Sequence, residues 1–186
     1  LITSRLVADL LKTAGVDRVV CVDLHASQIQ GFFSCLVDDL TAIPLLASHF
    51  ANVDTSDWIT VSPDHGGVNR ARRVAERLNT SLAIIDKRRS KPNEAEVMNI
   101  VGDVKGKHCL MIDDMIDTAG SCSEGAKALL AQGAKDVRIA CTHGIFSKPA
   151  SDRLLKTDLF KEIVTTDSIP LKDEMKDPRV TVLSLA

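Results

Sequence analysis

Hydrophobic positions along the chain follow two spacings that alternate. Apolar side chains three or four residues apart predict amphipathic helices over 3–14, 66–78 and 120–132. Short, uninterrupted apolar runs between these segments are typical of strands buried on both faces. Such runs predict strands over 19–22, 58–61, 82–85, 109–112 and 137–141. The alternation predicts an α/β fold in which a mostly parallel sheet is flanked by helices.

A weak repeat relates the two ends of this pattern. At an offset of 118 residues, Gly15 and His25 coincide with Gly133 and His143. The match fits a true duplication and equally fits the helix, glycine, strand order that many such folds share. Either reading predicts one complete α/β unit together with part of a second.

The boundary between the two units is expected in a polar stretch without periodicity at 54–57. Residues 1–54 would then be the remainder of an N-terminal domain, and residues 55–186 a C-terminal domain.

Composition narrows the class of protein. The 186 residues carry a net charge of −2, which predicts no broad attraction to nucleic acid or to an anionic membrane. No apolar run approaches the roughly 18 residues of a spanning helix, so no membrane partner is expected. The five cysteines are widely spaced and form no C-x-x-C pair. They predict free thiols and a cytoplasmic location.

The strongest chemical signal follows the strand predicted at 109–112. That strand runs into Asp113 and Asp114, and a loop of small and hydroxyl residues at 117–121 then opens a helix. Backbone N–H groups and a helix N-terminus suit a phosphate, whereas the two acids suit sugar hydroxyls or a cation. A ribose 5-phosphate presents both demands in one molecule. The alternative is a plain helix start, with Asp117 as its N-cap.

This segment resembles the phosphoribosyl-binding motif of the type I phosphoribosyltransferases. Further segments, at 23–33, 61–67, 85–89 and 142–147, resemble the ribose-phosphate diphosphokinase family, and the resemblance covers essentially the whole chain. It implies a type I phosphoribosyltransferase-like fold. The implied reaction moves the diphosphoryl group of MgATP to the 1-hydroxyl of ribose 5-phosphate, giving 5-phosphoribosyl 1-diphosphate and AMP. Mg²⁺ as cofactor and a homo-oligomer of the hexamer type, built from dimers, are implied as well.

The resemblance also assigns roles on the strand ends. Lys87 matches the catalytic lysine, and Arg89 matches a residue that contacts ribose 5-phosphate. His25 and Asp64 match the magnesium ligands. Without the resemblance, the basic run at 87–89 would be a solvated turn, and His25 would be a hydrogen-bonded structural residue.

The phosphate segment carries over in the same way. Asp113 and Asp114 would bind the ribose hydroxyls. The 5-phosphate loop would consist of Asp117, Thr118, Ala119, Gly120 and Ser121. Ala119 stands where many family members have glycine, and Ser121 where many have threonine. Both changes keep a tight loop that ends in a hydroxyl.

A regulatory phosphate or nucleotide site between subunits is a weaker implication. Ser27, Gln30 and Asp38 match positions near that site. The sequence departs from the family nearby, because Ser34 replaces an acid and Leu36 replaces a proline. A cation or subunit contact at that place is therefore in doubt.

Two other functions remain open. The chain could be a non-catalytic regulatory subunit associated with such a synthetase, or a phosphoribosyltransferase that consumes the activated sugar. The segments that hold ATP in the family have no counterpart in this sequence, which predicts a fragment that is inactive by itself.

Overall fold

The computed structural model describes residues 2–88 and 97–186, and its elements form two compact units, Leu1–Ala42 and Ile43–Ala186. The division falls after residue 42, whereas the sequence pattern suggested residue 54. The difference arises from helix α2 (Ile43–His49), which the pattern did not predict. Three of its side chains are buried, and it packs on helix α3 and strand β7 of the second unit.

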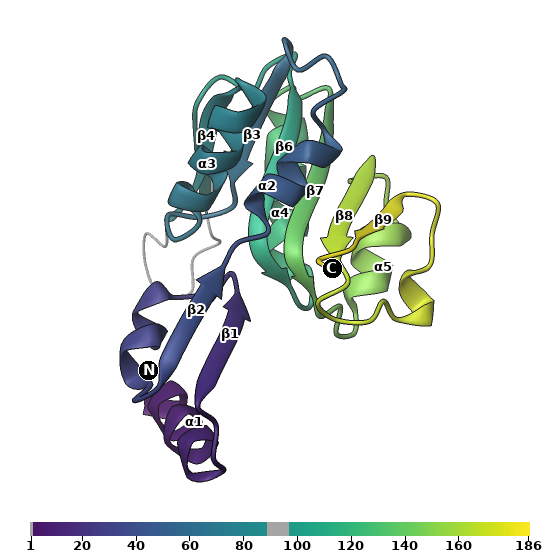
Figure 1. The fold of residues 1–186 in the computed structure, drawn as a ribbon. Coiled ribbons are helices and arrows are strands. Elements are labelled where there is room, and N and C mark those ends of the chain that lie inside the picture. The colour runs from purple at the N-terminus through teal and green to yellow at the C-terminus, as the bar shows by residue number, and fades with distance from the viewer. Residues whose placement is uncertain (1, 89–96) are drawn as a thin grey trace. The chain divides into compact units, whose positions relative to one another are not determined.

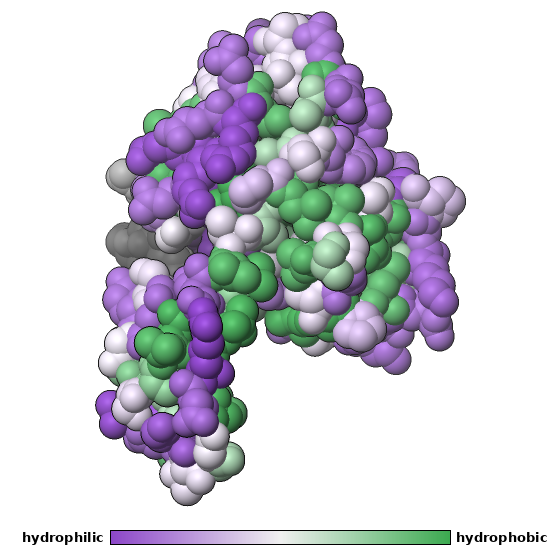
Figure 2. All heavy atoms as spheres, in the orientation of Figure 1, coloured by the Kyte–Doolittle hydropathy of each residue, from purple (hydrophilic) through white to green (hydrophobic). Residues whose placement is uncertain are grey.

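The first unit contains an α-helix, a 3₁₀ helix and a two-stranded parallel sheet. Helix α1 (Ile2–Thr13) precedes β1 (Arg18–Val22), a 3₁₀ helix η1 (Ser27–Phe32) and β2 (Leu36–Leu40). The predicted helix and first strand are confirmed, but β2 was not foreseen. Hydrophobic residues reach the surface of this unit among hydrophilic ones, as Figure 2 shows; Ile2 and Leu36 are 90% and 70% exposed.

The helices and strands of the structure repeat at the same offset of 118 residues. Helix α4 (Gly120–Ala131) begins 118 residues after α1 begins, and strand β7 (Asp136–Gly144) begins 118 residues after β1 begins. The intervening glycines share one backbone conformation, with φ of +93° at Gly15 and +89° at Gly133. Each helix therefore ends at a left-handed glycine before its strand begins.

The second unit is built on a seven-stranded sheet of order β5-β4-β3-β6-β7-β8-β9 (Figure 1). All neighbouring strands run parallel except β4 and β5, which are antiparallel. The strands are β3 (Trp58–Ser62), β4 (Ser81–Arg88), β5 (Val97–Val101), β6 (His108–Ile116), β7, β8 (Glu162–Thr166) and β9 (Val180–Leu183). The predicted α/β class is confirmed.

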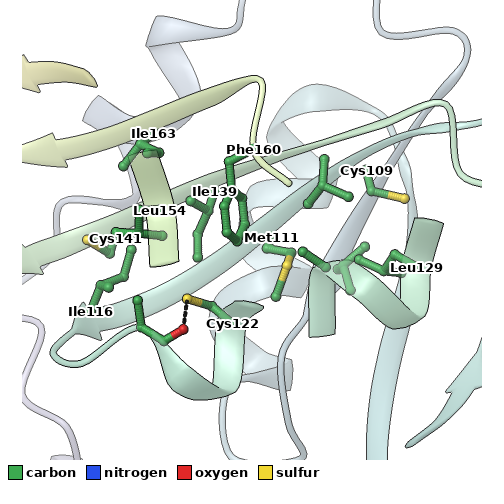
Figure 3. Close-up of a cluster of buried hydrophobic side chains, with 14 of the residues drawn as sticks. Cys109, Met111, Ile116, Cys122, Leu129, Ile139, Cys141, Leu154, Phe160 and Ile163 are labelled. Carbon is green, nitrogen blue, oxygen red and sulfur yellow. Dashed lines mark hydrogen bonds between the residues drawn. The ribbon is translucent and has the colours of Figure 1, made fainter. Parts of the chain in front are cut away.

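Helices cover both faces of this sheet. α2 and α3 (Val68–Leu78) pack together on one face, in front of the strands in Figure 1, and α4 lies behind the strands. α5 (Ala150–Leu155) packs against α4, and the 3₁₀ helix η2 (Asp173–Met175) packs against α5. Side chains alternate between the faces along β6, so Cys109 and Met111 enter the core beneath α4 (Figure 3). No helix in the described part of the chain is long and apolar enough to cross a membrane.

The cysteines of the second unit belong to this core. Cys109, Cys122 and Cys141 are buried and free, in agreement with the prediction of unpaired thiols. Burial raises the pKa of the Cys122 thiol to about 11. These cysteines are therefore protonated packing residues near neutral pH.

Charged residues link the amino ends of four neighbouring strands. Asp136, which begins β7, bonds to His108 Nδ1 of β6 at 2.8 Å and also accepts from Arg138. Arg138 Nε lies 3.5 Å from the Glu162 carboxylate of β8, and its guanidinium lies 4.5 Å from the centre of the Trp58 ring of β3. This amino-end network fastens the sheet at the edge opposite the carboxyl ends of its strands.

Candidate functional site

The predicted phosphate-binding loop and the predicted acids of the second unit lie at the carboxyl edge of the sheet. Asp64 follows β3, and Asp113 and Asp114 lie near the end of β6. Asp86, which was not among the predicted residues, lies near the end of β4. A short loop then leads from β6 into α4. Ligands of open parallel sheets bind at this edge, where strand ends and helix N-termini converge.

The loop from β6 to α4 has an unusual backbone at its centre. Ala119 adopts the left-handed conformation with φ of +59°, which residues other than glycine and asparagine seldom take. Its carbonyl accepts bonds from the backbone N–H of Ser123 at 3.1 Å and from the Cys122 thiol at 3.3 Å, the dashed line in Figure 3. The first turn of α4 carries no acidic residue, so its free N–H groups and positive dipole end favour an anion.

The two adjacent acids occupy different environments. The side chain of Asp114 is 4% exposed and that of Asp113 is 27% exposed. Arg70 Nη1 of α3 lies 3.6 Å from the Asp114 carboxylate and 3.9 Å from that of Asp113. Burial, together with the neighbouring Asp114, raises the pKa of Asp113 to about 7. The acid pair can thus change its charge near neutral pH when a hydroxyl donor or a cation arrives.

Sequence reasoning did not single out Arg70. One signal was available, because Arg70 precedes the inward-facing Val74 by four positions on α3 and so borders the buried stripe. A cation at the margin of such a stripe is placed to neutralise a carboxylate on the strand beneath.

Asp64 lies in the turn between β3 and α3. Its Oδ1 accepts the N–H of Gly67 at 2.9 Å, and Ser62 Oγ donates to its carbonyl at 2.7 Å. The next residue, His65, bonds through Nε2 to the buried Asp86 at 2.9 Å, a pairing that the sequence did not reveal. An exposed carboxylate held in this way fits a hard cation such as Mg²⁺.

The other predicted ligand, His25, is an exposed residue of the first unit. Within residues 2–88 and 97–186, no three His, Cys, Asp or Glu side chains are grouped closely enough to hold a metal ion by themselves. Mg²⁺ commonly takes only one or two protein carboxylates and completes its shell with water and substrate phosphates. The pairing of His25 with Asp64 therefore stays a prediction.

One predicted basic residue, Lys87, lies near the end of β4, and the other, Arg89, comes directly after the strand in the sequence. The backbone of Lys87 pairs with Met98 of β5 in the antiparallel ladder. Arg89 lies outside the described residues. The roles of both stay predictions.

The residues assigned to a regulatory site lie in the first unit, and two of them are already engaged there. Gln30 donates its amide to the Asp39 carboxylate at 3.4 Å, and Asp38 forms an ion pair with Arg18 at 2.6 Å. Ser27 is exposed at the start of η1. Their part in binding an effector stays a prediction.

Comparison with known proteins places this geometry in a family. The model of the phosphoribosyl transferase domain matches residues 40–175, which include the carboxyl edge and its loop. The chain belongs to the phosphoribosyl transferase family. Among solved structures, this phosphoribosyl transferase chain is similar to phosphoribosylpyrophosphate synthetase from Mycobacterium smegmatis, with a TM-score of 0.90 and 46% identity over 99% of this chain and 60% of that one. Adenine phosphoribosyl transferase from Trypanosoma brucei shares the fold at a TM-score of 0.53 and 17% identity, over 76% of this chain and 62% of that one.

Curated relatives show stronger likeness in sequence. Ribose-phosphate pyrophosphokinase from Oceanobacillus iheyensis is 52% identical over 185 residues, and the enzyme of that name from Clostridium acetobutylicum is 54% identical over 187 residues. Each alignment covers 100% of this phosphoribosyl transferase chain. The chain spans 58% of the length of these relatives.

The raised pKa of Asp113 predicts how stability depends on pH. The folded chain keeps this proton up to about pH 7, whereas the group's ordinary pKa is 3.8. The contribution of the protonated carboxyl to stability is thus fully present below about pH 3.8 and is lost as pH rises through about 7. Asp113→Asn cannot ionise, so its free energy of unfolding should exceed that of the wild type by about 1–3 kcal/mol at pH 8 and match it near pH 4.

Urea unfolding at several pH values measures this difference. Asp117→Asn removes an exposed carboxyl four residues away and should change stability by less than about 0.5 kcal/mol at either pH. A constant difference between Asp113→Asn and the wild type from pH 4 to pH 8 would contradict the assignment.

Proposed function

We propose that this chain is the ribose 5-phosphate-binding part of a ribose-phosphate pyrophosphokinase. The observation that carries the proposal is the β6 to α4 segment, where a half-buried and a buried acid, Asp113 and Asp114, precede a loop with exposed hydroxyl residues at a helix N-terminus. The 52% and 54% identity with ribose-phosphate pyrophosphokinases over the whole chain supports it. The second unit would be the C-terminal domain that binds the sugar phosphate, and the first unit would belong to an N-terminal domain.

The chemistry follows from the charges at the carboxyl edge. Asp113 and Asp114 would accept hydrogen bonds from the ribose hydroxyls, while the loop at 117–121 holds the 5-phosphate by its N–H groups and hydroxyls. This arrangement would leave the 1-hydroxyl free to attack the β-phosphorus of ATP, breaking the bond to the AMP oxygen. Lys87 would stabilise the negative charge that develops on the transferred group. Mg²⁺, with Asp64 and His25 as proposed ligands, would neutralise the phosphates of ATP.

Activity in the full-length gene product that carries this sequence tests the proposal. With ATP, Mg²⁺ and ribose 5-phosphate, AMP should appear together with 5-phosphoribosyl 1-diphosphate in equal amounts. AMP formation that does not require ribose 5-phosphate would overturn the proposal. Binding of the sugar phosphate without turnover would favour the non-catalytic regulatory subunit instead.

Thr118→Ala should weaken the binding of ribose 5-phosphate to this chain. The exposed hydroxyl lies in the phosphate loop, and a lost hydrogen bond to a charged phosphate costs about 1.5–3 kcal/mol, roughly ten- to hundredfold in affinity. Isothermal titration calorimetry measures the change, and Thr118→Ser, which keeps the hydroxyl, is the matched control. Equal affinities for the alanine variant and the wild type would remove Thr118 from the site.

A further inference from the structure

Arg153 contacts the phosphate loop from a distant part of the chain. It lies on α5, 35 residues after Thr118, and its Nη1 donates to the Thr118 carbonyl at 2.8 Å. The helix that carries it is anchored, because Ala150 and Leu154 are fully buried and Thr157 Oγ1 donates to the Arg153 carbonyl at 2.6 Å. The guanidinium therefore contacts the loop from a helix that is held in place by its own packing.

The hydrogen bond from Arg153 to the Thr118 carbonyl also affects the direction of the Ala119 N–H, because both groups belong to the same peptide. The Thr118 carbonyl and the Ala119 N–H belong to one planar trans peptide, in which the C=O and N–H bonds point in opposite directions. Holding the carbonyl toward Arg153 thus directs the Ala119 N–H to the other side of the loop. Because Ala119 has a φ of +59°, the loop gains from any restraint that opposes relaxation of this residue.

Gly120 allows the guanidinium to come this close. A Cβ on Gly120 would lie 3.2 Å from Arg153 Nη1 and 3.8 Å from its Cζ. The first of these distances is shorter than an ordinary van der Waals contact. The backbone of Gly120 itself needs no positive φ. The absence of a side chain at this position therefore serves the approach of Arg153.

We propose that Arg153 is a positioning residue, which orients the peptide between Thr118 and Ala119 so that the loop can bind phosphate. The inference rests on the proposed function, because the bound group is taken to be the phosphate of ribose 5-phosphate. Arg153 acts through the loop backbone, and its charge alone does not account for its effect. The conformation of the free loop therefore depends on Arg153 before any ligand binds.

A charge-matched control is available beside Arg153. Lys127 of α4 lines the same hollow of about 210 Å³ as Arg153 and Gly120, and it pairs with Glu124 at 2.7 Å. Lys127→Met removes one positive charge from this hollow without removing the bond to Thr118. Arg153→Met removes both the charge and the bond, whereas Arg153→Lys keeps the charge and one donor.

The first measurement uses the ligand-free 186-residue chain. Amide chemical shifts and hydrogen exchange of Ala119 and Gly120 should change in Arg153→Met, return most of the way in Arg153→Lys, and stay as in the wild type in Lys127→Met. Gly120→Ala, which crowds the guanidinium, should alter the Ala119 amide in the same direction as Arg153→Met. Unchanged Ala119 and Gly120 amides in Arg153→Met would overturn the inference.

The second measurement is affinity for ribose 5-phosphate by calorimetry. Arg153→Met should weaken binding about tenfold, Arg153→Lys about two- to threefold, and Lys127→Met less than twofold. Equal losses in Arg153→Met and Lys127→Met would mean that charge alone acts, and would overturn the inference. If the wild-type chain bound no ribose 5-phosphate, the proposed function would fail, while the amide measurement would still decide whether Arg153 orients the loop.

Discussion

Gly144→Ala should lower the free energy of unfolding of the second unit by about 3 kcal/mol. Gly144 ends β7, and a Cβ there would lie 2.3 Å from Phe146 Cε2 and 2.8 Å from Thr165 Oγ1. The Phe146 ring is fully buried, so a shift of the ring must displace other core side chains or expose apolar surface. Forcing an extra methyl group into such a site costs about 1–3 kcal/mol, and a contact this short belongs at the upper end.

Urea unfolding followed by circular dichroism measures the loss. Phe146→Leu in the Gly144→Ala background should recover part of it, because the smaller side chain makes room for the methyl group. Gly31→Ala, at a position with no other atom within 4 Å of the added Cβ, should be nearly neutral. If Gly144→Ala unfolded at the same urea concentration as the wild type, Gly144 could not lie in close contact with Phe146 and Thr165.

Gly144→Ala should also change the position of the phosphate loop. The backbone N–H of Phe146 donates to the Ile116 carbonyl at 3.0 Å, directly before Asp117. A displaced Phe146 would shift the end of β6 and, with it, the loop. We therefore expect the folded variant to bind ribose 5-phosphate more weakly as well.

Lys87→Ala in the full-length gene product should lower kcat at least about a hundredfold, with KM for ribose 5-phosphate changed less than about threefold. The backbone of β4 places Lys87 at the edge where Asp64 follows β3 and β6 carries the acid pair. In the proposed reaction, a compact positive charge there would be needed most when charge develops on the transferred diphosphoryl group, so its loss would affect the transition state more than binding.

Steady-state kinetics of AMP release give both constants. Lys87→Arg keeps the charge with a different shape, and we expect it to retain more turnover than the alanine variant. An alanine variant with the wild-type kcat would remove Lys87 from the mechanism. A rise in KM alone would give Lys87 a role in substrate binding instead.

The elements that the sequence predicted well are those with a strong local pattern. α3 and α4 carry apolar stripes, and β6 contains an apolar run that is followed by two acids. β2, β5, β8 and β9 lack such a signal. In β8, for example, Thr166 is buried, and its hydroxyl donates to the Thr142 carbonyl at 2.7 Å. That carbonyl belongs to β7, a strand that no local pattern around Thr166 reveals.

In the candidate site, too, the sequence identified the residues that form a local pattern and missed those whose contacts come from distant segments. Adjacent residues in the sequence identified the acid pair and the phosphate loop. The contacts of Arg70 and Arg153 join segments tens of residues apart, so no local pattern indicates them. The left-handed φ of Ala119 was hidden for a different reason, because alanine is small enough for a tight loop but gives no sign of an unfavourable backbone conformation.

The amino-end network has a consequence for how such a protein can change over time. The contacts among His108, Asp136, Arg138 and Glu162 fasten the strands at the edge away from the ligand. Substitutions in the loops of the opposite edge therefore leave these contacts intact. The loops at the carboxyl edge can therefore vary in sequence without cost to the contacts that hold the four strands together.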